Sequence, residues 1–237
     1  SDRAVGDYGF GGYATDAIAA IEAGIGAPCV VVGHSLGGVT AAAVAQQRPD
    51  HVRAVLLEDP AIFPPPAAGA STANVLDGNA LGDVFQLMYD SIPGIQAAGM
   101  SVDDLAAILA AGPSPSGPTA GELFHDDTFP AWARSNLALD VEVLAPVIDP
   151  TAMDPESFLA GGFDPTAPIP VPGLLLAGDP TLPDTVIRQG AVDLLHATSP
   201  DLTVEVVTGV GHMIHDDRNS RGLFLERLHA LLDAHAG

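Results

Sequence analysis

The 237-residue sequence contains no lysine, and its eight basic residues are all arginines set against 30 aspartates and glutamates. The formal net charge is therefore −22 at pH 7. Without lysine the chain can form neither a Schiff base with a substrate nor a Walker-type phosphate contact. Nucleic acids and anionic membranes are bound through Lys and Arg side chains, and a chain this acidic repels both. The composition excludes nucleic-acid binding.

Cysteine and long apolar runs are also scarce. Cys29 is the single cysteine, which excludes an intrachain disulfide, and its apolar surroundings predict a small buried hydrophobic residue. The apolar runs at residues 29–32 and 173–177 are far shorter than the roughly 20 residues that span a bilayer. Residues 1–16 lack the basic and apolar segments of a signal peptide, which predicts a cytoplasmic protein. The sequence also begins without methionine, as expected if an upstream segment has been removed.

Hydrophobic residues make up 47% of the chain, enough for a packed core. The first 60 residues read as helix, strand, glycine-rich turn, helix and strand, and this order predicts parallel strands joined by right-handed crossovers. Strand patterns return only near the C-terminus, each followed by a helix. The predicted strands are residues 28–32, 52–57, 171–177 and 202–207, and the predicted helices of this part are 15–23, 39–47, 184–197 and 220–234.

Residues 60–170 differ in composition from the rest of the chain. They are rich in Pro, Gly, Ser and Ala and contain no convincing strand pattern. Short helical patterns lie at residues 79–89, 102–110, 130–138, 141–148 and 155–159. The sequence therefore predicts a core formed by residues 1–59 and 171–237 and a helical insertion formed by residues 60–170.

A pattern for nucleophilic catalysis, Gly33-His34-Ser35-Leu36-Gly37, lies between the first predicted strand and the helix after it. A serine on such a tight turn is held at strained backbone angles, so the flanking positions must be small. The turn is expected to raise Oγ of Ser35 above the sheet at the helix N-terminus. The N–H of Leu36 then points to where an oxyanion forms. The pattern predicts Ser35 as nucleophile and Leu36 as an oxyanion donor.

The base predicted for this reaction is His212, which follows the last predicted strand in a Gly-x-Gly-His context. The small residues before His212 let its loop place an imidazole over the turn. There it can take the proton of Ser35 and return it to the leaving group.

These segments resemble the α/β-hydrolase family, in which serine, acid and histidine follow one another in that order. The resemblance runs from Asp7 to the C-terminus, with residues 60–170 similar only to a lid or cap. It implies a parallel sheet flanked by helices, with a mainly helical cap inserted after the strand that follows the elbow helix. The matching segments are residues 33–38 (nucleophile elbow), 52–60 (the next strand), 171–183 (acid-bearing strand and loop) and 209–212 (histidine loop).

Three carboxylates are candidates for the acid that orients His212 and stabilises its protonated form. Asp179 is the first choice, because it follows a strand where the family places its acid. Asp59 is the alternative, because some family members place the acid at the end of the preceding strand. Asp184 is the third candidate, although its position is more typical of a helix N-cap. Glu58 is expected to face away from Asp59, because side chains alternate along a strand.

No metal ion or cofactor is predicted. His212 and His215 could form a metal pair, but zinc sites need three or four ligands, and the sequence offers no matching second cluster. The run His125-Asp126-Asp127 is expected to be a polar loop of the insertion.

The resemblance also implies segments that this sequence lacks. Family members carry several strands before the elbow, and a loop among them supplies a second oxyanion N–H, whereas only residues 1–27 precede the first predicted strand here. The expectation is a fragment with an edge strand at residues 29–32 that invites pairing. Its activity is expected to be reduced, because one missing oxyanion donor costs about 10²–10³ in kcat.

The function predicted from these features is a serine hydrolase that cleaves a small-molecule carboxylic ester or lactone through an acyl-enzyme. The alternative is a non-catalytic ligand-binding protein or an inactive fragment. Substrate contacts are expected from His34, Trp132, Phe129 and Met213, although the aromatic pair is equally typical of the core of a cap. The sequence leaves the oligomeric state open.

Overall fold

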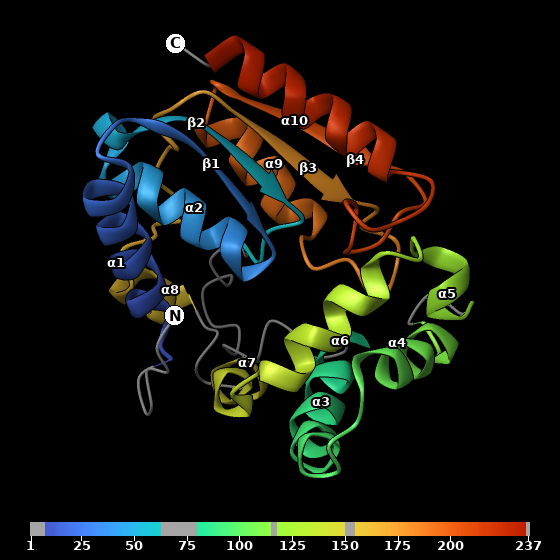
Figure 1. Cartoon of the computed structure of the whole chain (residues 1–237). Coiled ribbons are helices and arrows are strands. Elements are labelled where there is room, and N and C mark those ends of the chain that lie inside the picture. The colour runs from blue at the N-terminus through green and yellow to red at the C-terminus, as the bar shows by residue number, and fades with distance from the viewer. Residues whose placement is uncertain (1–7, 63–79, 115–117, 150–154, 236–237) are drawn as a thin grey trace, which may run out of the picture.

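The computed structural model describes residues 8–62, 80–114, 118–149 and 155–235, which form a four-stranded sheet flanked by helices (Figure 1). The strands lie side by side in chain order, and each neighbouring pair is parallel, which confirms the predicted α/β class. They are β1 (Cys29–His34), β2 (Val52–Glu58), β3 (Gly173–Gly178) and β4 (Leu202–Val207).

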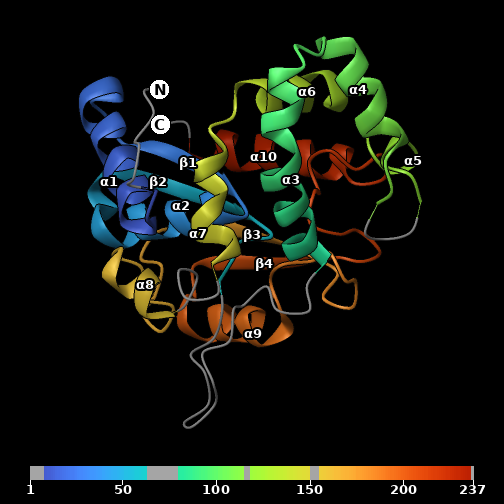
Figure 2. The same cartoon turned by 90° about the horizontal axis from the view of Figure 1, so that it is seen from below.

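Helices cover both faces of the sheet, and Figure 2 shows the sheet lying between α9 and α10. The core helices are α1 (Phe10–Ala20), α2 (Leu36–Gln47), α9 (Gln189–Thr198) and α10 (Arg221–His235). Side chains that alternate along β2 and β3 point to opposite faces. Leu57 and Leu175 belong to the cluster that contains residues of α1, α2 and α9, whereas Leu56, Leu174 and Leu176 pack with Phe224 of α10. Because both faces are covered, the two central strands are almost continuously apolar.

The two outer strands of this sheet, β1 and β4, are less buried than the central pair. Val32 of β1 is 46% exposed, and Cys29 is half-buried rather than buried. The expectation of a buried Cys29 is therefore wrong, because β1 has a neighbour on only one side among the described residues.

The strand at 202–207 has the predicted bounds, and the other strand ends lie within two residues of prediction. The helix predicted from residue 184 begins only at Gln189. The reason is tertiary: the N–H of Val186 donates to the carboxylate of Asp59 at 2.8 Å, which holds this segment outside the helix. At the other end of the chain, α1 begins before residue 15 and continues into a π-helical turn, Ile21–Ile25, closed by Gly26 in the left-handed region (φ 66°).

Among the described residues, seven helical elements connect β2 to β3, and those from α3 to α6 lie at the carboxyl ends of the strands, where the arrowheads in Figure 1 point toward α3 and α6. They are α3 (Ala80–Ala97), α4 (Val102–Ala111), α5 (Ala120–Leu123), α6 (Thr128–Ala138), a 3₁₀ turn (Val141–Leu144), α7 (Ala145–Ile148) and α8 (Pro155–Ala160). The predicted helical patterns do not include α5, although Thr119 and Glu122 form a capping box at its start, which is a recognisable signal in the sequence.

The insertion divides into two parts by its packing. Leu105, Phe129 and Ala133 form a small core of its own between α4 and α6. In contrast, Phe158 of α8 packs edge-on against Phe10 of α1, with ring centroids 4.9 Å apart, and both belong to the main core. The part of the predicted 60–170 insertion from Pro155 onward therefore packs on the α/β core. In the part of the chain described, no helix is both long enough and apolar enough to cross a membrane.

We expect Phe163→Ala to destabilise the whole fold, because Phe163 is fully buried in the main core. Removing a buried phenylalanine costs about 3–5 kcal/mol in the free energy of unfolding. The matched control is Leu159→Ala, since Leu159 is 52% exposed in the same segment and its loss should have little effect. Urea unfolding measures both, and equal midpoints for the two variants would show that this segment is not part of the core.

Candidate active site

Ser35 occupies the sharp turn between β1 and α2, with φ 56° and ψ −124°. The elbow is tied to the end of β2 by its backbone. The N–H of Ser35 donates to the carbonyl of Glu58 at 2.9 Å, and the N–H of Ala61 donates to the carbonyl of Ser35 at 3.2 Å. Leu36 opens α2, so its N–H belongs to the first turn, whose N–H groups have no acceptor within the helix.

Close packing explains which glycines the turn requires. A Cβ on Gly33 would lie 2.1 Å from the carbonyl oxygen of Gly37, and a Cβ on Gly38 would lie 2.7 Å from Cβ of Pro60. A Cβ on Gly37 would meet nothing within 4 Å. The second glycine of the Gly-x-Ser-x-Gly pattern is therefore dispensable for packing, and the following Gly38 is the restricted position.

His212 and Asp59 form a buried pair at the carboxyl edge of the sheet. The Nδ1–H of His212 donates to Oδ2 of Asp59 at 2.6 Å, and both side chains are almost fully buried. The carboxylate also accepts from the backbone N–H groups of Gly178 (3.1 Å) and Val186 (2.8 Å). Because a carboxylate can only accept, the proton of a neutral His212 sits on Nδ1 and the lone pair on Nε2.

The backbone is strained both at the elbow and at the turn that follows β2. Among the described residues, Ser35 (φ 56°) and Asp59 (φ 35°) are the non-glycine residues with positive φ. Such conformations cost free energy and persist where the surrounding structure fixes them, which is common at functional sites.

The structure places Asp179, the preferred acid, away from His212. Its carboxylate accepts from the N–H (3.0 Å) and hydroxyl (2.6 Å) of Thr181 and from the N–H of Gly209 (2.8 Å). The hydroxyl of Thr181 is the main cause that holds the pKa of Asp179 below its usual value. The geometry thus corrects the first choice and favours the alternative, Asp59, because the end of β2 lies directly beside the elbow.

Asp184, the third candidate, lies beside the histidine loop, whereas Nδ1 of His212 donates to Asp59. Asp184 is buried against Gly211, where an added Cβ would approach its Oδ2 to 2.2 Å. It does not cap the next helix, since the N-cap of α9 is Arg188. The carboxylate that pairs with His212 could be found in the run Glu58-Asp59-Pro60, but only the packing of β2 between β1 and β3 distinguishes it from the other candidates.

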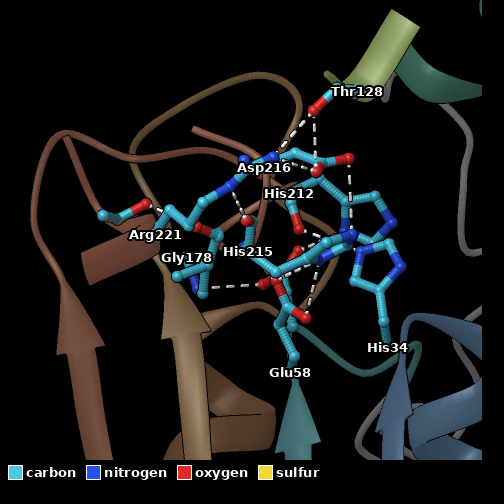
Figure 3. Close-up of polar contacts among 11 residues, drawn as sticks. His34, Glu58, Thr128, Gly178, His212, His215, Asp216 and Arg221 are labelled. Carbon is cyan, nitrogen blue, oxygen red and sulfur yellow. Dashed lines mark hydrogen bonds and ion pairs between the residues drawn. The ribbon is translucent and has the colours of Figure 1, made fainter. Parts of the chain in front are cut away.

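A second polar group lies beside this pair and is shown in Figure 3. Glu58 is buried, and its carboxylate has a different partner from that of Asp59. It accepts from the backbone N–H of His215 at 2.7 Å and from Nδ1 of the same residue at 2.9 Å. The imidazole of His34 lies 4.3 Å from that of His212 and 5.1 Å from that of His215, measured between ring centroids. Its Nε2–H donates to the carbonyl of His212 at 3.0 Å.

The two outer histidines have opposite pKa shifts. Burial, reinforced by the charges of His212 and His215, lowers the pKa of His34 well below its ordinary value. Burial alone also lowers the pKa of His215, but the hydrogen bond and the charge of Glu58 outweigh it, so the pKa of His215 is raised overall. At neutral pH the ring of His34 is therefore uncharged.

The loop that carries His212 also holds the insertion in place. Thr128, at the start of α6, donates through Oγ1 to Oδ1 of Asp216 at 2.9 Å. Nη2 of Arg221 donates to both of these oxygens, also at 2.9 Å (Figure 3). The backbone adds a bond from the N–H of His125 to the carbonyl of Asp216 at 3.1 Å. We call Thr128, Asp216 and Arg221 the latch.

The run His125-Asp126-Asp127, expected to be only a polar loop, takes part in the same attachment. Arg218 donates to the carboxylate of Asp126, and Arg221 donates to that of Asp127 at 2.7 Å. The hydrogen bond from Arg221 lowers the pKa of Asp127.

Of the expected substrate contacts, Phe129 and Trp132 pack on each other inside the insertion, with ring centroids 5.7 Å apart. Phe129 is 4% exposed and has little surface left for a substrate, so its predicted role is corrected to packing, because α4 and α6 need it as their own core. Trp132 and Met213 are half-buried, and Met213 directly follows His212.

A strained serine between a strand and a helix, a buried His–Asp pair and a helical insertion at the carboxyl edge define the α/β-hydrolase class. The comparison with protein families agrees: residues 1–224 match the model described as "Alpha/beta hydrolase family". The chain belongs to the alpha/beta hydrolase family.

Among solved structures, the chain is similar to E-2-(acetamidomethylene)succinate hydrolase, with 20% identity and a TM-score of 0.61 over 98% of this chain and 77% of that one. It is also similar to an esterase from Exiguobacterium antarcticum (16% identity, TM-score 0.60, 98% and 77% covered). A third is an N-acyl homoserine lactone degrading enzyme (19% identity, TM-score 0.54, 95% and 76% covered). At these identities the likeness concerns the fold. No curated protein matches the chain.

We expect Gly38→Ala and Gly37→Ala to behave differently, although both add one methyl group to the elbow. At Gly38 the methyl collides with Pro60, so the turn must shift and the protein should lose stability by about 1–3 kcal/mol. At Gly37 the methyl enters open space, and alanine should be neutral or stabilising by about 0.4–1 kcal/mol. Thermal unfolding of the two variants tests this; equal losses would contradict the packing argument.

We expect Thr128→Val to loosen the insertion, because it removes the hydroxyl that Asp216 and Arg221 share. Leaving such buried partners unsatisfied costs about 1–3 kcal/mol. Hydrogen exchange should become faster in α5 and α6 and stay unchanged in β2 and β3. Thr128→Ser keeps the hydroxyl and should restore protection, and a valine variant with native exchange in α6 would show that the latch does not hold the insertion.

Proposed function

We propose that the protein is a serine hydrolase that cleaves a carboxylic ester or lactone through an acyl-enzyme. The observation that carries this proposal is the buried Asp59–His212 pair beside the strained Ser35. Ser35 directly follows His34, whose ring is tilted by 43° to that of His212 with centroids 4.3 Å apart. This proximity supports Ser35 as the nucleophile and His212 as its base.

In the first half-reaction, Nε2 of His212 takes the proton of Ser35 while Oγ attacks the acyl carbon. Asp59 holds the Nδ1–H tautomer and stabilises the imidazolium that forms. The N–H of Leu36, at the positive end of α2, donates to the oxyanion. His212 then protonates the leaving alcohol, and the acyl group remains on Ser35.

In the second half-reaction, His212 takes a proton from a water molecule as its oxygen attacks the acyl carbon. The bond between the acyl carbon and Oγ of Ser35 then breaks, His212 returns the proton to Oγ, and the acid is released. During both half-reactions, the hydrogen bond from Nε2 of His34 to the carbonyl of His212 holds the histidine loop beside the elbow. His34 thus acts on the base by positioning it.

Two features support an uncharged acyl substrate. The carboxylates of Glu58 and Asp59 lie at the site, and the whole chain carries a net charge of −22, so an anionic substrate is repelled. His34, the histidine next to the nucleophile, is neutral because burial lowers its pKa. The structural relatives include an esterase and a lactone-degrading enzyme, which is in keeping with ester and lactone chemistry.

The direct test is labelling with a fluorophosphonate, which reacts with an activated serine. We expect stoichiometric labelling on the peptide that contains Ser35, read by intact and peptide mass, and no labelling of Ser35→Ala. A chain that is folded by circular dichroism and stays unlabelled would overturn the hydrolase proposal. It would leave a ligand-binding protein of the same fold.

The same labelling assay distinguishes the two acids. Asp59→Asn presents an amide to Nδ1 of His212 and favours the wrong tautomer, so the labelling rate should fall by about 10⁴-fold. Asp179→Asn is the matched control, since the carboxylate of Asp179 binds Thr181 and Gly209, and its rate should stay close to that of the unmodified chain. The reverse result would return the acid role to Asp179.

A further inference from the structure

The polar group beside the proposed triad has the composition of a metal site. One nitrogen of His34, one nitrogen of His215 and one carboxylate oxygen of Glu58 all lie within 4.8 Å of one another. We propose that these three residues form a binding site for a divalent transition-metal ion of the Zn²⁺ type. This inference does not depend on the proposed hydrolysis.

The spacing of the three side chains requires only small movements to bind an ion. With zinc–ligand bonds of about 2.0–2.2 Å, tetrahedral geometry places ligand atoms about 3.3–3.5 Å apart. Nδ1 of His215 already lies 2.9 Å from both carboxylate oxygens of Glu58. A bound ion would take the place of the Nδ1 proton between them. The rings of His34 and His215 are close as well, with centroids 5.1 Å apart.

The donor set determines the class of ion. Two imidazoles and one carboxylate are a ligand set of zinc sites that keep an open fourth position. Mg²⁺ and Ca²⁺ prefer sites made of oxygen atoms, and a thiolate-requiring ion finds no sulfur ligand in this cluster. Zn²⁺, or Co²⁺ as its spectroscopic substitute, is therefore the expected occupant.

A hydrogen bond of His34 sets which nitrogen would bind the ion: Nδ1 would have to be the ligand for this bond to persist. The Nε2–H of His34 donates to the backbone carbonyl of His212 at 3.0 Å, which leaves the lone pair on Nδ1. Histidine ligands usually donate their second ring N–H to such a carbonyl or to a carboxylate, which fixes the tautomer and the ring orientation.

The three ligands come from a rigid part of the fold. His34 is the last residue of β1, Glu58 is the last residue of β2, and His215 lies in the loop after β4. Glu58 is buried, and a buried carboxylate is stable only when it is paired, so the site already contains a fixed negative charge for an ion to bind. The side chain of His215 is 32% exposed and gives an ion access from solvent.

Isothermal titration calorimetry of the untagged chain with Zn²⁺ tests this site, with excess Mg²⁺ present to occupy the acidic surface. We expect one tightly bound Zn²⁺ per chain. Losing one of three ligands should weaken binding by at least about 10–100-fold, so His34→Gln and His215→Gln should both show this loss. His196→Gln replaces an exposed histidine of α9 and should bind like the unmodified chain.

Co²⁺ gives an independent reading of the same site. Bound at a low-coordinate site with nitrogen ligands, Co²⁺ should show intense visible absorption bands that disappear in His215→Gln. That variant is expected to fold, because His215 is partly exposed, and circular dichroism checks this. Absence of Zn²⁺ binding, or equal affinity in the His34, His215 and His196 variants, would overturn the proposal. Equal affinity would assign the ion to surface carboxylates.

Discussion

The hydrogen bond between Asp59 and His212 is the contact on which the carboxyl edge of the sheet depends. A buried carboxylate must be fully satisfied, and Asp59 is satisfied by three donors from three separate parts of the chain: Gly178, Val186 and His212. These bonds join the end of β2 to β3, to the segment before α9 and to the histidine loop. One side chain therefore connects these three segments at the edge of the sheet that carries Ser35.

The end of β2 carries two adjacent carboxylates, and each of them binds a different histidine. Glu58 pairs with His215, while Asp59 pairs with His212. The ring centroid of His34 lies 4.3 Å from that of His212 and 5.1 Å from that of His215. Two adjacent carboxylates thus serve two different groups: a pair suited to proton transfer and a group suited to holding a cation. The positive φ of Asp59 turns the chain away immediately after this dipeptide.

The histidine loop links the site to the insertion. Asp216 lies four residues after His212 and takes part in the latch with Thr128 and Arg221. The hydrogen bonds of the latch thus connect α6 directly to the loop that carries the proposed base. Loops and lids that move over an active site commonly control substrate entry and product release. Here the attachment point of the insertion and the base share one short segment of chain.

The sequence by itself determined the α/β class, four strands to within two residues at their ends, and the elbow at Ser35. It did so because alternating and continuous apolar runs, and the crowding around a tight turn, are local properties. Local patterns placed His212 in a loop after the last strand, where the structure has it.

Only the tertiary structure decided which carboxylate meets His212. Asp59 and Asp179 both end a strand of the same sheet, and their local sequences do not tell which one lies beside the elbow. The choice depends on the order of strands and on donors such as Val186, 127 residues away from Asp59 in the chain. The cluster of His34, Glu58 and His215 is equally invisible locally, because its members come from three elements. Long-range packing brings these side chains together, and no short window of sequence contains that information.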